Sequence, residues 1–257
     1  MKLDNNKIEI IGVKGIPLIK PGDDVAKIIC KAIKKQGLKI ENEDILVISQ
    51  TIVSKAEGSI FRLKNIKPSI QAKIISELTS KPSEVVEVIL RESKRIIRLR
   101  GQNLITQTKH GFICANSGVD VSNVSGGDMV TTLPKNPDES AKKIRNKIKK
   151  ITGKDVAVII SDTSGRPLRI GQVNIAIGVS GLNPILDRRG EKDLFGYTLK
   201  VKQIAIADEL ASAAELVMGE ADEGVPVAII RGYKKYVKSD NAKASMLARP
   251  IKDDLFV

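Results

Sequence analysis

Short runs rich in apolar residues recur along the chain and predict β-strands. Each run has the length of a strand rather than that of a helix. The runs lie at residues 8–13, 45–48, 156–160, 173–179 and 225–230. The run at 156–160, Val-Ala-Val-Ile-Ile, is the strongest of them.

Other segments carry apolar residues at helical spacing. In the first of them, Asp23 and Asp24 supply an N-cap and first-turn carboxylates, an apolar stripe runs from Val25 to Ile33, and Gly37 ends the helix. The same spacing predicts further helices. The expected helices cover residues 23–37, 68–80, 82–93, 138–151 and 208–218.

Three shorter strands are expected at residues 96–99, 104–108 and 112–115. A stretch rich in Gly, Asn and Ser follows them and ends at Gly127. The chain shows no internal repeat, no low-complexity linker and no shift in composition that would mark a domain boundary. The mixture of strands and helices indicates an α/β or an α+β protein.

The composition limits how the core can be built. The 257 residues allow one large or two moderate domains, and 42% of them are hydrophobic. Aromatic residues make up only 3% of the chain, and there is no Trp. The core must therefore consist mainly of Ile, Val, Leu and Ala.

An excess of basic residues predicts anionic ligands. The 43 Lys and Arg against 30 Asp and Glu give a formal net charge of +13, which attracts nucleotides, phosphorylated substrates and nucleic acids alike. Part of the charge lies at residues 142–150, where a solvated helix face is the simplest interpretation. Single-strand binders stack bases on aromatic side chains, and seven scattered aromatics offer little for such a platform.

The cysteines and the start of the chain predict a cytoplasmic protein. Cys30 and Cys114 form no C-x-x-C pair, so neither a disulfide framework nor a structural zinc site is expected. The first seven residues are polar, unlike a secretory signal. The longest charge-free run, residues 170–186, contains Asn, Gln, Pro and Gly, which argues against a membrane span.

Acidic residues at the ends of predicted strands are the first candidates for chemistry. The single His110 disfavours His-rich metal sites and serine triads, and neither a P-loop nor a G-x-G-x-x-G fingerprint is present. Asp120 and Asp162 both lie where a strand is expected to give way to a polar loop. Two carboxylates with neutral oxygens suit Mg²⁺ or Mn²⁺, whereas the structural alternative is an ordinary Asx turn. Glu209 stands near a helix start, where a favourable interaction with the helix dipole is the alternative to a functional role.

Basic residues near these acids are the second group of candidates. Lys55 follows a predicted strand and could contact phosphate, although most lysines are solvated surface residues. Arg166 and Arg169 flank Pro167 in the segment after the strongest strand. Their guanidinium groups could hold a carboxylate or a phosphate, and two solvated charges are the alternative.

A series of six motifs in order resembles one known family. The family is that of the coenzyme F-420-0:γ-L-glutamate ligases, and the resemblance spans residues 8 to about 232. Six motifs in the same order are far more specific than any single motif. The motifs are Gly15-Ile16-Pro17-Leu18-Ile19 with Gly22-Asp23-Asp24, Ser54-Lys55-Ala56-Glu57-Gly58, Asn116-Ser117-Gly118-Val119-Asp120 with Ser122-Asn123, Ser161-Asp162-Thr163-Ser164-Gly165-Arg166-Pro167, Ala207-Asp208-Glu209-Leu210-Ala211 with Met218-Gly219-Glu220, and Arg231-Gly232.

The resemblance implies an α+β fold with mixed sheets and flanking helices. It also implies that residues 1–257 form a single unit of two intertwined subdomains, with no boundary visible in the sequence. The implied activity is addition of L-glutamate to the lactyl carboxylate tail of deazaflavin coenzyme F-420-0, and of a further glutamate by γ-linkage, while GTP is cleaved to GDP and phosphate. A homodimer, two divalent metal sites for Mg²⁺ or Mn²⁺, and stimulation by K⁺ are implied as well.

The resemblance also implies roles for individual residues. Asp120 and Asp162 would hold one metal ion, and Thr163 with Glu209 a second. Asp120, Asp162 and Lys55 would carry the catalysis, and Arg166 and Arg169 are possible substrate contacts. The residues implied in GTP binding are Ile16, Pro17, Leu18, Ile19, Gln50, Thr51, Lys55 and Asn123.

The implied chemistry agrees with the residue types available. Phosphoryl transfer from GTP to the acid would give an acyl phosphate, and such transfer needs positioning and charge neutralisation rather than a protein nucleophile. Two alternatives stay open: a basic nucleic-acid-binding protein without catalysis, and a metal-dependent nucleotide phosphotransferase that shares the site but not the ligation.

Overall fold

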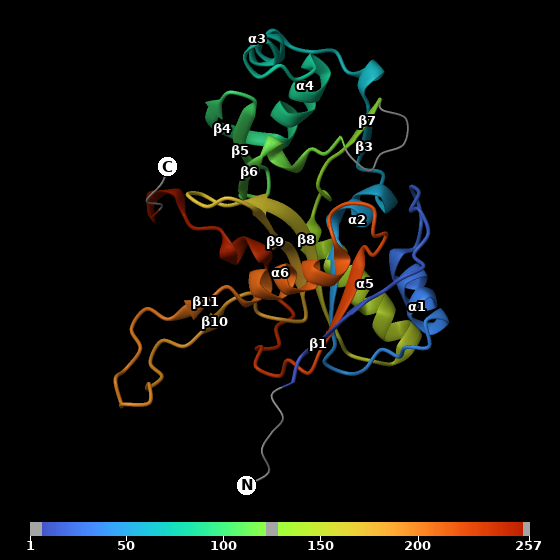
Figure 1. Cartoon of the computed structure of the whole chain (residues 1–257), viewed down its shortest axis with the longest axis vertical. Helices are drawn as coiled ribbons and strands as arrows, with labels where there is room; N and C mark the ends of the chain where they lie inside the picture. Colours follow the sequence, from blue (N-terminus) through green and yellow to red (C-terminus); the bar gives the residue numbers. More distant parts are fainter. Residues whose placement is uncertain (1–6, 122–127, 254–257) are drawn as a thin grey trace.

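A computed structural model describes residues 7–121 and 128–253 of the chain (Figure 1). Its main sheet has five strands in the order β1-β12-β2-β8-β9. Only β2 and β8 are parallel; the other neighbours are antiparallel. The strands are β1 (Glu9–Gly12), β12 (Val227–Arg231), β2 (Ile45–Ser49), β8 (Ala157–Gly165) and β9 (Gln172–Ser180).

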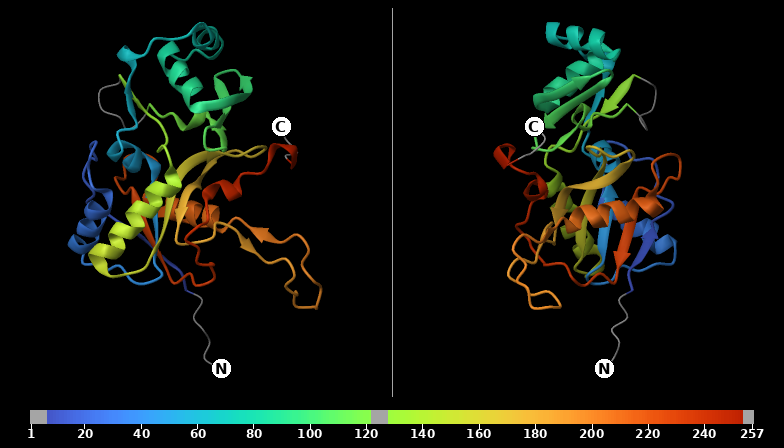
Figure 2. Two further views of the ribbon diagram at one scale, coloured as in Figure 1. Left: turned by 180° about the vertical axis from the view of Figure 1, so that it is seen from behind. Right: turned by 60° about the vertical axis from the view of Figure 1, so that its left-hand side comes forward.

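Helices cover both faces of the main sheet. Helix α6 (Ile206–Met218) crosses one face, and α5 (Pro137–Thr152) with α1 (Val25–Lys35) covers the other (Figures 1 and 2). The short helix α2 (Gln50–Ala56) continues directly from β2. The apolar runs of the central strands supply the core, in which every side chain from Ile45 to Ile48 is fully buried.

Residues 60–121 and 128–131 build a second hydrophobic core beside the first. Helices α3 (Ile70–Thr79) and α4 (Ser83–Glu92) pack there with a three-stranded antiparallel sheet and with a two-stranded sheet. Val86, Ile89, Leu104 and Val130 are fully buried in this core. The three-stranded sheet consists of β4 (Ser93–Arg100), β5 (Asn103–Thr108) and β6 (Ile113–Ala115), and the two-stranded sheet of β3 (Ile60–Arg62) and β7 (Met129–Thr131).

Two short antiparallel strands, β10 (Leu186–Asp187) and β11 (Gln203–Ile204), form the base of an arm that projects from the body (Figure 1). Leu194 and Phe195 on this arm are 99% and 96% exposed. The remaining elements are single turns of 3₁₀ helix. They are η1 (Leu63–Asn65), η2 (Asn116–Gly118), η3 (Ala244–Leu247) and η4 (Ile251–Asp253).

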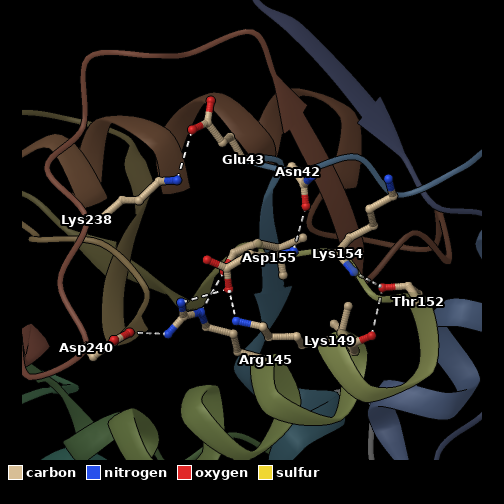
Figure 3. A network of polar contacts seen from close by, with 11 residues as sticks. Asn42, Glu43, Arg145, Lys149, Thr152, Lys154, Asp155, Lys238 and Asp240 are labelled. Carbon is tan, nitrogen blue, oxygen red and sulfur yellow. Dashed lines mark hydrogen bonds and ion pairs between the residues drawn. The ribbon is translucent and has the colours of Figure 1, made fainter.

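A polar cluster ties α5 to the chain segment that enters β8 (Figure 3). Arg145 donates hydrogen bonds to the carbonyl of Val156 at 2.8 Å, to Asp155 at 3.0 Å, and to Asp240. Lys149 adds a second bond to Asp155 at 3.3 Å. Burial by itself would raise the pKa of Asp155, but the charges of Arg145 and Lys149 outweigh it and hold that pKa below its ordinary value.

The structure confirms the expected α+β class and corrects two local predictions. Residues 161–165, expected as a loop, extend strand β8, because β9 pairs with them beyond a bulge at Ile160/Ser161. Residues 50–56, which are not among the expected helices, form helix α2, whose N-cap is Ser49. None of the described helices is long and apolar enough to cross a membrane.

Candidate active site

A cavity of about 480 Å³ opens where the main sheet meets the second core. Strands β2 and β8, which are parallel, both point their C-terminal ends at it, since Ser49 pairs with Ser161. Its walls come from segments far apart in the chain. They include residues 16–19, 49–52, Lys55, Ala115, residues 118–120, residues 161–163, Gln172, Asn174, residues 218–221 and residues 223–226.

Asp162 lies on the part of β8 that extends beyond the bulge, opposite Ile175 of β9. Burial of its carboxyl group raises the pKa of Asp162 to about 7. The backbone N–H of Thr163 opposes this shift, while the negative charges of Asp120 and Glu220 add to it. A carboxylate held under such conditions is a group that a cation would stabilise.

Asp120 reaches the same cavity from the second core. Its backbone pairs with Thr131 of β7 through two hydrogen bonds of 3.0 and 2.9 Å. Lys55, in the last turn of α2, lines the cavity beside it. Burial lowers the pKa of Lys55, and the negative charge of Asp120 opposes that shift, so the two groups are electrostatically coupled.

The turn before Asp120 has an uncommon backbone conformation. Asn116, Ser117 and Gly118 all have positive φ angles, of 54°, 53° and 68°. The hydroxyl of buried Ser117 lies 2.7 Å from the hydroxyl of Ser93 and 2.7 Å from that of Thr106. These contacts hold the left-handed turn against the second core, and residues kept in such a conformation often serve a site.

The structure brings Glu220, rather than Glu209, to Thr163. The hydroxyl of Thr163 donates to Glu220 at 2.7 Å, and the side-chain amide of Asn174 donates to the other Glu220 oxygen at 2.6 Å. Glu209 is exposed on α6 and does not line the cavity; its charge acts instead on Tyr233. No role was predicted for Glu220 from the sequence, although Met218-Gly219-Glu220 belongs to one of the six motifs.

All of the described residues implied in nucleotide binding line the cavity. Residues 16–19 are among them, with Leu18 89% exposed and Ile19 buried. Gln50 and Thr51 follow at the start of α2, where the Gln50 amide donates to the Thr51 hydroxyl at 3.3 Å and Ser54 donates to Gln50 at 2.8 Å. Asn123 lies outside the described residues.

Neither of the two candidate arginines after β8 lines the cavity. Arg166 donates to the backbone carbonyls of Ile170 at 2.7 Å and of Gly171 at 3.3 Å, so its guanidinium group closes its own hairpin. Arg169 is exposed in the same turn. Their role as substrate contacts stays a prediction.

The oxygen atoms at the cavity suit a hard cation, provided that a substrate supplies further ligands. Every candidate ligand is oxygen: the carboxylates of Asp120, Asp162 and Glu220 and the hydroxyl of Thr163. The buried hydroxyl of Ser161 also faces this region and has no hydrogen-bond partner within the described chain. Across residues 7–121 and 128–253, however, no three His, Cys, Asp or Glu side chains are close enough to bind a metal ion by themselves. Phosphate oxygens of a nucleotide would complete such a site.

Comparison with known proteins gives matches over almost the entire chain. The family model described as F420-0:Gamma-glutamyl ligase matches residues 13–232, which include every part of the cavity wall. Two curated relatives are named coenzyme F420:L-glutamate ligase. The one from Methanothermobacter thermautotrophicus is 51% identical over 250 residues, 97% of this chain and 98% of the relative. The one from Methanocaldococcus jannaschii is 50% identical over 255 residues, 98% of each chain.

Proposed function

The chain belongs to the F420-0:gamma-glutamyl ligase family, and from this premise we propose that it joins L-glutamate to the carboxylate tail of deazaflavin coenzyme F420-0, with GTP as the phosphoryl donor. The names of the relatives support the acid and the amino acid. One observation in particular supports phosphoryl transfer: a single cavity gathers the carboxylates of Asp120, Asp162, Glu220 and Glu223, the hydroxyl of Thr163 and Lys55.

Amide formation requires that one carboxylate oxygen becomes a leaving group. In the proposed reaction this oxygen attacks the γ-phosphorus of GTP, the bond to the β-phosphate oxygen breaks, and GDP and an acyl phosphate form. The glutamate nitrogen then attacks the acyl carbon, the carbon–oxygen bond breaks, and phosphate leaves with that oxygen while the amine releases a proton. No protein nucleophile is needed, which agrees with the thiols: burial raises the pKa of Cys30 to about 11 and that of Cys114 to about 12.

Lys55 is the basic residue best placed to act on the nucleotide. It lines the same cavity as residues 16–19 and Asp120, and it is the only basic residue among the lining residues of the described chain. An ammonium group there would contact phosphate oxygens and offset the charge that develops during transfer. Gln50 and Thr51 at the start of α2 line the same cavity and would contact the nucleotide as well.

The carboxylates are proposed to hold two divalent ions, Mg²⁺ or Mn²⁺. Asp120 and Asp162 would hold the first, and Thr163 with Glu220, in place of Glu209, the second. When bound, such ions neutralise phosphate charge and orient the transferred group. The K⁺ stimulation implied by the resemblance is part of the proposal and is assigned to no residue.

A second addition and a homodimer complete the proposal. After the first ligation, the γ-carboxylate of the added glutamate is a new acid that the same cavity can activate. The exposed apolar side chains Leu194 and Phe195 on the projecting arm support a partner, because monomers seldom leave such residues in water together. A second copy of the chain is the partner that we propose.

The proposal is tested by incubating the purified protein with GTP, Mn²⁺, L-glutamate and coenzyme F420-0, and by following products by mass. We expect a gain of one and then two glutamyl units, together with GDP and phosphate. GDP formation that is independent of glutamate and of F420-0 would favour the nucleotide phosphotransferase instead. Nucleic-acid affinity that falls steeply with salt, without any GTP cleavage, would favour the binding protein.

An oxygen label tests the acyl phosphate separately. With ¹⁸O in the terminal carboxylate of F420-0, one labelled oxygen should appear in the released inorganic phosphate. Label retained wholly in the amide product, or pyrophosphate as co-product, would rule out this intermediate and leave the ligase activity standing.

A further inference from the structure

Three arginines lie side by side on the outward face of the three-stranded sheet. Arg95, Arg98 and Arg100 of β4 are all exposed, whereas Leu99 between them packs against the second core. Arg95 and Arg98 are three residues apart and would face opposite sides of a regular strand. A bulge between Ile96 and Arg98 shifts the register, and both arginines come to the outward face.

The strand register leads from this arginine row to the cavity. Arg98 pairs with Ile105 of β5, and Ile105 pairs with Ala115 of β6. Residues opposite one another across neighbouring strands share a face, and Ala115 lines the cavity. Two strand spacings place the Cα of Arg98 about 10 Å from that of Ala115. Figure 1 shows β6 as the strand of this sheet nearest to β8 and β9.

The charge of the arginine row is not neutralised by nearby carboxylates. Among the described residues, none of the three arginines forms an ion pair; Arg95 donates only to the amide oxygen of Gln107, at 3.1 Å. Neighbouring basic residues differ, since Arg91 pairs with Glu87 at 2.9 Å. Alternate residues on one strand face stand about 7 Å apart, so the row repels itself and favours an anion with more than one charge.

The size of the cavity limits what else it can hold. A nucleotide and the reacting carboxylate must share about 480 Å³, so the rest of the acid substrate has to lie outside. Ligation also raises the charge of that substrate. It converts one carboxylate into an amide and adds the two carboxylates of glutamate, a gain of one negative charge for each addition.

We propose that the arginine row binds a second anionic group of the acid substrate, a phosphate or a carboxylate that lies outside the cavity. The inference rests on the proposed function, because it places the distal end of the same substrate. Guanidinium groups hold phosphate and carboxylate in bidentate geometry, which suits a row that has no other counterion. The row would therefore contribute to recognition of the acid and leave nucleotide binding unaffected.

The test compares the double variant Arg95→Ala/Arg98→Ala with Arg62→Ala. Arg62 is an exposed arginine on β3, another strand beside the second core, and serves as the matched control. We expect the KM for coenzyme F420-0 to rise about tenfold or more in the double variant, the scale of losing one charge-assisted contact. The KM for GTP and the kcat at saturating F420-0 should stay unchanged, as should all three parameters in Arg62→Ala. Arg98→Lys keeps the charge but loses the bidentate guanidinium group, so its KM for F420-0 should lie between those of the parent protein and the double variant.

Salt dependence gives an independent readout. The KM of the parent protein for F420-0 should rise with KCl concentration more steeply than that of the double variant, because fewer charge contacts remain to be screened. An unchanged KM and an unchanged salt slope in the double variant would overturn the inference. A loss of duplex or RNA affinity in the double variant, with the KM for F420-0 unchanged, would also overturn it and assign the row to nucleic acid. Absence of ligation by the parent protein would refute the proposed function instead.

Discussion

Thr163 on strand β8 donates a hydrogen bond of 2.7 Å to Glu220, a residue that follows helix α6. The amide of Asn174 on β9 holds the second oxygen of the same carboxylate at 2.6 Å. Glu220 thus stands in a fixed position at the cavity, although it belongs to a segment that the chain reaches 57 residues later. This contact joins β8 to residues 218–221, which form another part of the cavity wall.

The first prediction concerns which glutamate serves the site. Glu220→Gln should lower kcat for ligation by at least about a hundredfold, since the carboxylate charge is lost next to Thr163 and the proposed second ion is weakened. Glu209→Gln should leave kcat within about twofold, the usual effect of an exposed surface substitution. Steady-state GDP release with Mn²⁺ measures both variants. The reverse ranking would return the second ligand to Glu209.

The second prediction concerns Lys55. Removing a charge-assisted contact in a half-buried site costs about 1.5–3 kcal/mol, so Lys55→Ala should weaken GTP binding or slow ligation by roughly ten- to a hundredfold. Lys64, exposed in the 3₁₀ turn η1, is the control. Titration calorimetry with GTP and single-turnover kinetics separate binding from transfer. Small and equal effects at the two lysines would show that Lys55 takes no part in nucleotide binding or transfer.

The sequence predicted those strands and helices that have a clear hydrophobic pattern of their own. The runs at 45–48 and 156–160 are continuous in apolar residues because both faces of these strands are buried. Such a run can be recognised from the sequence alone. The part of β8 from Ser161 to Gly165 has a polar sequence. It is a strand because it pairs with β9, and its own sequence does not show that pairing. Helix α2 has seven residues, too few for a helical period to stand out.

The candidate site shows the same limit. The six motifs contain both Glu209 and Glu220, but only Glu209 was expected to bind a metal ion. The structure places them differently: Glu209 lies in the first turn of α6, on the exposed side near Tyr233, and Glu220 lies beyond the end of α6 at the cavity. Likewise, the arginine row depends on a bulge in β4, and a bulge is a feature of pairing that the sequence of one strand does not reveal.

The third prediction concerns the left-handed turn before Asp120. Ser117→Ala removes a buried hydroxyl that contacts Ser93 and Thr106, and it keeps a Cβ at a φ of 53°, so the backbone strain stays as in the parent. From the hydroxyl alone we expect a loss of about 1–3 kcal/mol in the free energy of unfolding. Ser117→Gly also loses the hydroxyl but tolerates the positive φ, so it should be more stable than Ser117→Ala by about 1 kcal/mol.

Urea unfolding with both variants measures that difference. An alanine variant at least as stable as the glycine variant would show that the turn carries no backbone strain. A matching loss of ligation rate in Ser117→Ala, at temperatures where it is folded, would show that the hydroxyl contacts position Asp120.

The fourth prediction uses the raised pKa of Asp162 in protein stripped of divalent metal. The folded state holds the proton up to about pH 7, while the unfolded carboxyl has the ordinary value of 3.8. Because the folded state binds more protons between these values, stability must fall as the pH rises from about 4 to 7 and stay level with respect to this group above that. The ionised carboxylate therefore destabilises the metal-free fold by at most about 4 kcal/mol near neutral pH.

Asp162→Asn keeps the shape of the side chain and cannot ionise. In EDTA its free energy of unfolding should exceed that of the parent protein at pH 8, and the gap should close toward pH 4, whereas exposed Asp253→Asn should follow the parent throughout. Adding Mn²⁺ with a GTP analogue at pH 8 should reverse the order, since ligands that bind only the folded parent stabilise it in proportion to their concentration. The same variant should not ligate glutamate at a measurable rate. Thermal unfolding from pH 4 to 8 provides the comparison, and curves for Asp162→Asn and the parent that run parallel over this range would show that Asp162 titrates like a solvated aspartate.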